Sequence, residues 1–338
     1  MSELGVAVIG LGIGRRHIQA YRNIPGVEVV AITDVDEEAL KKTQQEYGVP
    51  FAFTDYREAI YRDDVDVVSI CTPDRLHVEQ SLFALEAGKH VLCEKPMATS
   101  LEDAARVVDK VRETGLKFMA GYNYRFIPQF AKVKEIVASG ELGDLFFADS
   151  SYIQDLYAME ALGPDYWRFK DPQDFYLGGA VHNIDLLRWI LGEIEEVHSY
   201  SNHMMPFYPI DDNYVSNFRF ANGCIGRVLL VLGARLKAKF YVDLNVYGYE
   251  GGLSTSMQRS EVIKNMDKLE RDTLATIPVE KANSHEREIS HFVECVREDK
   301  PPLVDVVEGA KAVAVCLAGI RSAREGRPVT VDYSFLQG

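Results

Sequence analysis

The sequence predicts an α/β protein of two domains: a doubly wound, parallel sheet, followed by an α+β domain with one large, mostly antiparallel open sheet. Three observations lead to this prediction. Short apolar runs alternate with helical patterns from residue 1 to about 121, which is the rhythm of βαβ units. Longer strand-like runs replace this alternation from residue 122 onwards. The length of 338 residues suits about two domains, and we assign residues 1–121 to the first and 122–338 to the second.

Composition and charge restrict the classes of partner. The formal net charge of −14 argues against nucleic acid, because phosphate binding needs a clustered basic face, and favours a small neutral substrate. No apolar run approaches the roughly 20 residues of a membrane span, and the first residues lack the pattern of a signal peptide, so we expect a cytoplasmic protein without a membrane partner. The five cysteines are scattered and form no C-x-x-C pair, which predicts buried free thiols and no metal site.

A glycine-rich turn follows the first predicted strand, and a helical pattern continues from it to Tyr21. Its residues are Gly10, Leu11, Gly12, Ile13 and Gly14. Glycines let the backbone approach a dinucleotide pyrophosphate, and a helix N-terminus adds N–H groups and partial positive charge. The third glycine comes one residue earlier than in the usual G-x-G-x-x-G pattern, so an ordinary strand-to-helix turn is the alternative. On the dinucleotide interpretation, the five turn residues contact the cofactor and the first domain is a Rossmann domain.

An acidic residue supports the dinucleotide interpretation. A second predicted strand, 27–33, ends at Asp34, about twenty residues after the glycines, which is the spacing at which a carboxylate meets the adenosine ribose hydroxyls. A carboxylate repels a 2′-phosphate, and Val35 follows it with no adjacent arginine, so NAD is favoured over NADP. The alternative role for Asp34 is N-cap of the helix predicted at 37–47.

Later strands of the first domain end in further candidate cofactor contacts. After a short strand and a helix between residues 51 and 61, the buried run 65–71 ends at Thr72 and Pro73. A helix then carries His77 at its start, where the imidazole faces either the cofactor or the helix surface. Open α/β sheets bind their ligands at the carboxyl ends of the strands, which is where these residues lie.

The stretch Glu94-Lys95-Pro96 stands at the end of another apolar run, 90–93. Lys95 is therefore a cation at the carboxyl end of a parallel strand, and Pro96 biases its backbone away from helix. A solvated lysine is the alternative to a catalytic one. A helix at 101–113, capped by Ser100, and a strand at 117–120 complete the domain.

The second predicted domain opens with Tyr-Asn-Tyr-Arg-Phe at 122–126 and a helix that runs to Ser139. Its strand-like runs are 145–154, 194–203, 213–221, 224–233 and 239–248. The irregular segment 155–179 between the first two runs is rich in aromatic residues, which either bind the C–H faces of a sugar or pack within the protein. Helices at 284–298 and 305–325 and a strand at 329–331 close the chain, and we assign both helices to packing.

One helix of the second domain carries a candidate base. After two glycines, apolar residues recur at helical spacing through Leu187, and His182 and Asp185 lie three residues apart on one face. A carboxylate one turn from an imidazole can orient it and stabilise its charged form. The alternative is a pair of polar residues on the helix surface.

Taken together, the glycine turn, Asp34, the E-K-P stretch, the Tyr-Asn-Tyr-Arg-Phe run and the H-x-x-D helix resemble the glucose–fructose oxidoreductase/inositol dehydrogenase (Gfo/Idh/MocA) family. The resemblance spans nearly the whole chain. It implies an N-terminal Rossmann domain that holds a nicotinamide dinucleotide. It also implies a C-terminal α/β domain that contacts substrate and assembles through its sheet, so we expect a homodimer or homotetramer. Members mostly oxidise or reduce a secondary alcohol of a sugar or cyclitol.

The resemblance also assigns roles to residues. Lys95 corresponds to the family lysine near the reacting oxygen, and His182 to the family histidine that exchanges its proton. The family often has an aspartate four residues before this histidine, and that position is Gly178 here. The predicted cofactor contacts are the five turn residues with Asp34, Thr72, Pro73, His77, Glu94, Lys95 and Asn123. The predicted substrate contacts are Lys95, Arg125, Tyr152, Trp167, His182 and Asp185.

We therefore predict an NAD-dependent dehydrogenase or reductase of sugars, cyclitols or their derivatives. His182 acts as general base in oxidation, and the Lys95 ammonium stabilises the developing alkoxide. One alternative is a redox-neutral NAD-dependent glycosidase, which would retain its cofactor and show no net absorbance change. The other is a non-catalytic regulator that binds a dinucleotide or sugar, an alternative kept open by Gly178 in place of the family aspartate.

Overall fold

The computed structural model describes residues 4–163, 166–234, 240–265 and 274–337. The chain divides into two compact units. The first unit comprises Met1–Asn123, Asn283–Val313 and Tyr333–Gly338. The second unit comprises Tyr124–Ala282 and Ala314–Asp332. In the part of the chain that is described, no helix is both long and apolar enough to cross a membrane.

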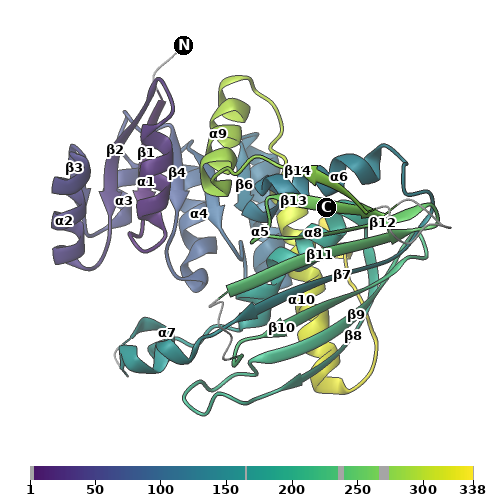
Figure 1. Ribbon diagram of the computed structural model, residues 1–338. Coiled ribbons are helices and arrows are strands. Elements are labelled where there is room, and N and C mark those ends of the chain that lie inside the picture. The colour runs from purple at the N-terminus through teal and green to yellow at the C-terminus, as the bar shows by residue number, and fades with distance from the viewer. Residues whose placement is uncertain (1–3, 164–165, 235–239, 266–273, 338) are drawn as a thin grey trace. The chain divides into compact units, whose positions relative to one another are not determined.

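The first unit contains a six-stranded sheet in the order β3-β2-β1-β4-β5-β6, and every neighbouring pair is parallel (Figure 1). Its strands are β1 (Leu4–Ile9), β2 (Val27–Thr33), β3 (Phe51–Phe53), β4 (Val67–Ile70), β5 (His90–Glu94) and β6 (Phe118–Gly121). β1 and β4 are fully buried, and all of their residues except Ser69 are glycine or apolar. The strand order changes direction between β1 and β4, where such sheets bind ligands. The predicted parallel, doubly wound sheet is confirmed.

Helices connect these strands as the sequence predicts. They are α1 (Gly14–Arg22), α2 (Glu37–Tyr47), α3 (Tyr56–Ile60), the 3₁₀ turn η1 (Asp74–Leu76), α4 (His77–Glu86) and α5 (Leu101–Thr114). The predicted cap Ser100 accepts the Asp103 N–H at 3.1 Å, and Gly115 ends α5 in a left-handed conformation. Asp36 caps α2 by accepting the N–H groups of Glu38 and Ala39.

Part of the C-terminal chain belongs to the first unit, in contrast to the division predicted at residue 121. This part holds α9 (Ser284–Arg297) and the start of α10 (Val306–Glu325). α9 packs against α1, and the Arg297 guanidinium donates to the carbonyls of Pro25 and Gly26 at 2.7 and 2.8 Å. The Val304 carbonyl accepts the N–H of Ala120 at 3.0 Å. An amphipathic pattern shows that α9 has an apolar face but does not show which sheet this face covers.

The second unit contains a nine-stranded sheet in the order β14-β13-β12-β11-β7-β10-β9-β8-β15 (Figure 1). Its strands are β7 (Leu145–Gln154), β8 (Ile194–Asn202), β9 (Asn213–Phe220), β10 (Ile225–Val231), β11 (Phe240–Gly248), β12 (Gly251–Ser256), β13 (Glu261–Asn265), β14 (Leu274–Pro278) and β15 (Val329–Thr330). β10 and β7 are parallel, and the other neighbours are antiparallel. The predicted large, mostly antiparallel sheet is therefore confirmed.

The sequence did not predict β12, β13 and β14. β12 begins with two glycines and continues Leu-Ser-Thr-Ser, so it lacks the alternation of large apolar residues that marks a strand. Its register comes instead from pairing with β11, in which Gly248 faces Gly251 and Asp243 faces Ser256. This pairing between chain segments is a tertiary contact that the local pattern does not show.

Helices of the second unit position its candidate residues. They are the 3₁₀ turn η2 (Asn123–Phe126), α6 (Pro128–Ala138), the 3₁₀ turn η3 (Tyr157–Leu162), α7 (Trp167–Lys170), the π-helical turn Tyr176–Ala180, α8 (Val181–Leu191) and the second part of α10. α8 packs on β7 and β10, and all of its residues except Trp189 are buried. Along β9 buried and more exposed residues alternate, so one face of the sheet is covered and the other is partly accessible to solvent.

Candidate functional site

The glycine turn of the first unit has the geometry that close approach of a ligand requires. Gly10 has φ +89°, and a Cβ there would lie 2.7 Å from the Cys71 carbonyl oxygen. A Cβ at Gly14 would lie 2.9 Å from a methyl carbon of Val8. At Gly12, by contrast, a Cβ would meet no atom within 4 Å. Gly10 and Gly14 are therefore needed for packing between strand and helix, whereas Gly12 leaves open space above the turn.

The N-terminus of α1 differs from those of α2, α5 and α9. Ile13 supplies no side-chain cap, and the first turn of α1 holds no acidic residue. α2, α5 and α9 are capped by Asp36, Ser100 and Asn283. The start of α1 therefore presents its N–H groups and partial positive charge beside the open space at Gly12, an arrangement that suits a pyrophosphate.

Asp34 is tied to the glycine turn. Its Oδ2 accepts the Leu11 N–H at 2.7 Å, and its Oδ1 accepts the Asp36 N–H at 3.0 Å. Because Asp36 caps α2, the alternative role of Asp34 as N-cap is excluded. Asp34 is half-buried and Val35 is 89% exposed. The carboxylate thus lies at the turn itself, and its predicted contact with the ribose hydroxyls of a cofactor stays a prediction.

His77 links two strand-end loops. Its Nδ1 lies 2.8 Å from the Pro96 carbonyl oxygen, and its Nε2 lies 2.8 Å from the Thr72 carbonyl oxygen. Burial lowers the pKa of His77, but neighbouring Cys93 and the two carbonyls outweigh it and raise the pKa to about 9. Both ring nitrogens thus lie within hydrogen-bond distance of backbone carbonyls, and His77 links the loop after β4 to the loop after β5. The predicted contacts of Thr72, Pro73 and His77 with a cofactor stay predictions.

The carboxylate of Glu94 lies inside the first unit. Its Oε1 is 3.1 Å from His17 Nε2, and its Oε2 accepts the backbone N–H of Lys95 at 3.2 Å. His17 Nδ1 is 2.8 Å from the Ser69 hydroxyl. Burial raises the pKa of Glu94, but the hydrogen bond from His17 and the charges of His17 and Lys95 outweigh it and hold the pKa well below its usual range. Glu94 is therefore a buried, ionised carboxylate.

Two residues of α9, a helix assigned to packing from the sequence, lie near Glu94. Burial lowers the pKa of His285 to about 4, against the opposing charge of Glu94. The ring centroids of His285 and His17 are 6.2 Å apart. Burial raises the pKa of Glu288 well above its usual range, and the Glu94 charge raises it further. Among the described residues, neither carboxyl oxygen of Glu288 has a hydrogen-bond partner.

Lys95 and Asn123 occupy the ends of adjacent strands. Lys95 follows the last residue of β5, is half-buried, and is joined to Pro96 by a cis peptide bond. Asn123 follows β6, and its amide nitrogen is 3.2 Å from His285 Nε2. Both side chains lie at the carboxyl edge of the parallel sheet, as the sequence predicts for cofactor contacts. His17 and His285 were not predicted, and their placement beside Glu94 depends on helix packing.

In the second unit, His182 lies on α8 and is 8% exposed. Its imidazole stacks on the ring of Tyr124, with centroids 4.3 Å apart and planes 16° apart. Tyr124 is buried, and burial raises the pKa of its hydroxyl well above the usual value, so it stays neutral. The stacked phenol therefore fixes the plane of the imidazole without adding charge.

Arg125 and Asp185 bind each other. The guanidinium donates to the two carboxylate oxygens at 2.8 and 2.7 Å, and both side chains are buried. Arg188 lies 3.9 Å from the same carboxylate and pairs with Glu193 at 2.9 Å. This bidentate pair joins η2 to α8. Each group is thus bound by the other. Substrate binding by both residues, predicted from the sequence, stays a prediction.

The position of the family aspartate carries no side chain. Gly178 lies in the π-helical turn before α8, and a Cβ there would meet no atom within 4 Å. The neighbouring Gly179 packs against Tyr152, whose Cζ would be 3.4 Å from a Cβ. Burial raises the pKa of Tyr152 to about 12, and its hydroxyl donates to Gln154 at 3.0 Å. Trp167 lies in α7, but its side chain lies outside the described part of the structure.

The five cysteines are buried free thiols, as predicted. Within the described residues, no group of three or more His, Cys, Asp or Glu side chains is arranged to hold a metal ion.

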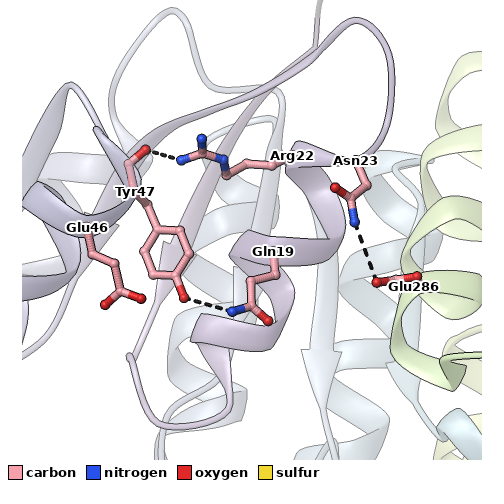
Figure 2. A pocket seen from close by; sticks show the side chains of 6 residues that line it. All are labelled: Gln19, Arg22, Asn23, Glu46, Tyr47 and Glu286. Atoms are coloured by element: carbon pink, nitrogen blue, oxygen red, sulfur yellow. Dashed lines mark hydrogen bonds between the residues drawn. The ribbon is translucent and has the colours of Figure 1, made fainter.

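A hollow on the first unit lies apart from the predicted contacts. It measures about 480 Å³ and is lined by Gln19, Arg22, Asn23, Glu46, Tyr47 and Glu286. The Gln19 amide donates to the Tyr47 hydroxyl at 2.9 Å, and Arg22 donates to the Tyr47 carbonyl (Figure 2). The hollow thus lies between the outer parts of α1, α2 and α9, and its polar side chains largely bind each other. We assign it no part of the chemistry.

Comparison with known proteins matches both units. Residues 4–122 match the Gfo/Idh/MocA profile described as an oxidoreductase family with an NAD-binding Rossmann fold. Residues 134–331 match the profile of the family's C-terminal alpha/beta domain.

Curated relatives cover most of the chain. One is the levoglucosan dehydrogenase of Pseudarthrobacter phenanthrenivorans, 28% identical over 299 residues, which are 78% of this chain and 76% of that protein. Another is the myo-inositol 2-dehydrogenase of Thermotoga maritima, 26% identical, with 97% of this chain and 98% of that protein covered. Among solved structures, a levoglucosan dehydrogenase in complex with NADH and L-sorbose has a TM-score of 0.90 at 25% identity, covering 98% of this chain and 100% of that one.

The buried pair of Arg125 and Asp185 predicts a large loss of stability when one partner is neutralised. Asp185→Asn leaves the Arg125 charge buried beside an amide, so we expect the free energy of unfolding to fall by about 3–5 kcal/mol. Urea denaturation measures this change. The control is Lys132→Ala, which breaks a partly exposed ion pair with Glu135 and should cost less than about 0.5 kcal/mol. Equal small losses in both variants would contradict the structural role of Asp185.

Glu288 predicts a dependence of stability on pH. Its raised pKa means that the folded chain keeps a proton that the unfolded chain loses above about pH 4.3, so this group lowers stability as pH rises. Glu288→Gln removes the titration. We expect the stability of the variant relative to the wild type to increase between pH 5 and pH 8, by up to about 1.4 kcal/mol per pH unit. Urea denaturation at each pH measures it, with Glu294→Gln, an exposed residue of the same helix, as control. A relative stability that is flat with pH would show that Glu288 is ionised in the folded state.

Proposed function

The chain belongs to the Gfo/Idh/MocA oxidoreductase family, and from this we propose that it is an NAD-dependent dehydrogenase or reductase. It transfers a hydride between nicotinamide and a secondary alcohol or ketone of a sugar, a cyclitol or a derivative of one. The observation that carries the proposal is the glycine turn, in which Gly12 faces open space and Asp34 binds the Leu11 N–H. The relatives named above act on a sugar anhydride and on a cyclitol.

The residues of the first unit fit a dinucleotide. Gly12 and the uncapped start of α1 would hold the pyrophosphate, and Asp34 would accept from the adenosine ribose hydroxyls. The bound nicotinamide supplies the hydride acceptor or donor. The Asp34 carboxylate favours NAD over NADP because it would repel a 2′-phosphate.

Lys95 is proposed to bind the reacting oxygen of the substrate. Its ammonium donates a hydrogen bond that strengthens as negative charge develops on this oxygen in oxidation, so it stabilises the transition state more than the ground state. Glu94, whose Oε2 accepts the Lys95 N–H, holds the backbone from which this side chain extends.

His182 is proposed to be the general base in oxidation and the general acid in reduction. In oxidation it takes the hydroxyl proton while the carbinol C–H leaves as hydride. The Tyr124 ring fixes the imidazole plane, and the pair of Arg125 and Asp185 holds η2 against α8. Because position 178 is glycine, no carboxylate assists the imidazole from there. We propose Tyr152 and Trp167 as substrate contacts, and for Arg125 and Asp185 a positioning role.

The test is absorbance at the NADH band after mixing the purified protein with NAD or NADP and a panel of cyclitols, aldoses and glycosides. We expect reduction of NAD, with little reduction of NADP, by at least one panel member. Lys95→Ala and His182→Ala should each lower the rate by about 10²–10⁴-fold, because each removes a group that handles charge or a proton in the transition state.

Lys300→Ala is the matched control, since its side chain is 60% exposed, and it should turn over at the wild-type rate. Dinucleotide binding without reduction by any panel member would reject the dehydrogenase. Retained NAD with a glycoside cleaved and no absorbance change would point to the redox-neutral glycosidase.

We also propose that copies of the chain associate through the partly exposed face of the nine-stranded sheet. Tyr200, Ile225 and Tyr247 lie on that face and are 60%, 53% and 40% exposed. Exposed apolar side chains that share one face are typical of interfaces. Sedimentation velocity should show a homodimer or homotetramer. Ile225→Lys should shift the distribution of species towards monomer. A wild-type monomer at micromolar concentration would contradict the proposal.

A cytoplasmic location remains a prediction from the sequence.

A further inference from the structure

The carboxylate of Glu94 directly precedes the proposed catalytic lysine and faces inward. Its two oxygens have different partners, His17 Nε2 at 3.1 Å and the Lys95 N–H at 3.2 Å. The residue is 8% exposed. Gly121 of the adjacent strand makes room for it, because a Cβ there would lie 3.2 Å from Glu94 Cα and 3.5 Å from Glu94 Cδ. The geometry thus ties this carboxylate to the backbone of Lys95.

His17 anchors the carboxylate to two other elements. It lies on α1, the helix that begins at the glycine turn, and it is fully buried. Its Nδ1 is 2.8 Å from the hydroxyl of Ser69 on β4, and Ser69 also accepts from Tyr21 of α1 at 3.4 Å. The side chains Ser69, His17 and Glu94 therefore form a continuous chain of hydrogen bonds from β4 through α1 to β5.

Glu94 is a buried negative charge next to Lys95, and burial favours the neutral forms of His285, Glu288 and Cys71 around it. Burial keeps Glu288 protonated and His285 neutral near pH 7, because it raises the pKa of the carboxyl and lowers that of the imidazole. Burial likewise raises the pKa of the Cys71 thiol, which stays neutral. The titratable groups that interact with Glu94 are His17 on α1, Cys71 after β4, Lys95 after β5, and His285 and Glu288 on α9. Two carboxyls of one cluster are thus held in opposite protonation states, an arrangement typical of functional sites.

We propose that Glu94 and His17 act together as positioning residues for Lys95: His17 fixes the Glu94 carboxylate, and this carboxylate fixes the backbone and stabilises the charge of the lysine. The proposal deepens the proposed function and rests on it for the use of the Lys95 ammonium at the substrate oxygen. A carboxylate near an ammonium stabilises the charged form, so removal of the Glu94 charge should make Lys95 lose its proton at lower pH.

The experiment measures the titration of Lys95 without turnover. The lysines of the full chain are dimethylated with ¹³C-formaldehyde, and the Lys95 signal is identified by its absence from Lys95→Ala. Glu94→Gln keeps the shape of the side chain and removes its charge, and we expect the Lys95 midpoint to fall by about one pH unit or more. Glu102→Gln, which removes an exposed carboxylate from the helix after the E-K-P stretch, should leave the midpoint unchanged.

A matched pair at position 17 tests the anchor. The amide of Asn can replace Nδ1 and keep the bond to Ser69, whereas the longer Gln can replace Nε2 and keep the bond to Glu94. We expect His17→Asn to lower kcat roughly 10- to 100-fold with the KM for NAD changed less than about twofold, and His17→Gln to retain most of kcat. A stability defect alone would lower both variants alike.

The outcomes separate this inference from the proposed function. An unchanged Lys95 midpoint in folded Glu94→Gln, or equal kcat in the two His17 variants, would overturn the inference even in an active dehydrogenase. A shifted midpoint in a chain without dehydrogenase activity would support the coupling between Glu94 and Lys95 and reject the function. If Glu94→Gln does not fold, the His17 pair decides.

Discussion

The pairing of the Glu94 carboxylate is the constraint on which the candidate site of the first unit depends. An ionised carboxylate left unpaired in the interior costs several kcal/mol, so its partners are obligatory. This requirement places His17 on the inner face of α1, Ser69 beneath it on β4, and glycine at 121, where a side chain would press against Glu94. The same α1 begins at the glycine turn, so one helix has its uncapped N-terminus at that turn and a contact with Glu94 on its buried face.

The second unit follows the same principle with a different pair. Arg125 and Asp185 neutralise each other in the interior, and their bidentate bond determines how η2 meets α8. Tyr124, next to Arg125 in the chain, is thereby placed against His182. The pair thus fixes the backbone next to the ring that stacks on the imidazole. The glycines before α8 are a separate feature, since a Cβ at Gly178 would meet no atom within 4 Å.

Much of the fold and part of the site were predictable, and the exceptions have identifiable causes. The parallel sheet, the Ser100 cap and the large second sheet follow from periodicity and capping residues, which act locally. The N-cap of α2 proved to be Asp36 and not Asp34, because two acidic residues near a helix start compete and the turn at Leu11 takes the first. The sequence did not predict β12 because its small and polar residues lack the apolar alternation of a strand, and its place in the sheet comes from pairing with β11. The sequence did not single out His285 and Glu288. A helix that contributes polar groups to the interior can have the same amphipathic pattern as a helix that only packs against its neighbours.

The sequence by itself determined the order of the elements, the glycine turn with its acidic residue, and the stretch that places Lys95 at a strand end, because each depends on neighbours within a few residues. Only the tertiary structure decided which charges are buried together. It brought His17 to Glu94, Arg125 to Asp185 and α9 to the first unit, and it set the opposite protonation states of Glu94 and Glu288. The physical reason is that burial and pairing depend on contacts between segments distant in the chain, and these contacts change the ionisation of a carboxyl.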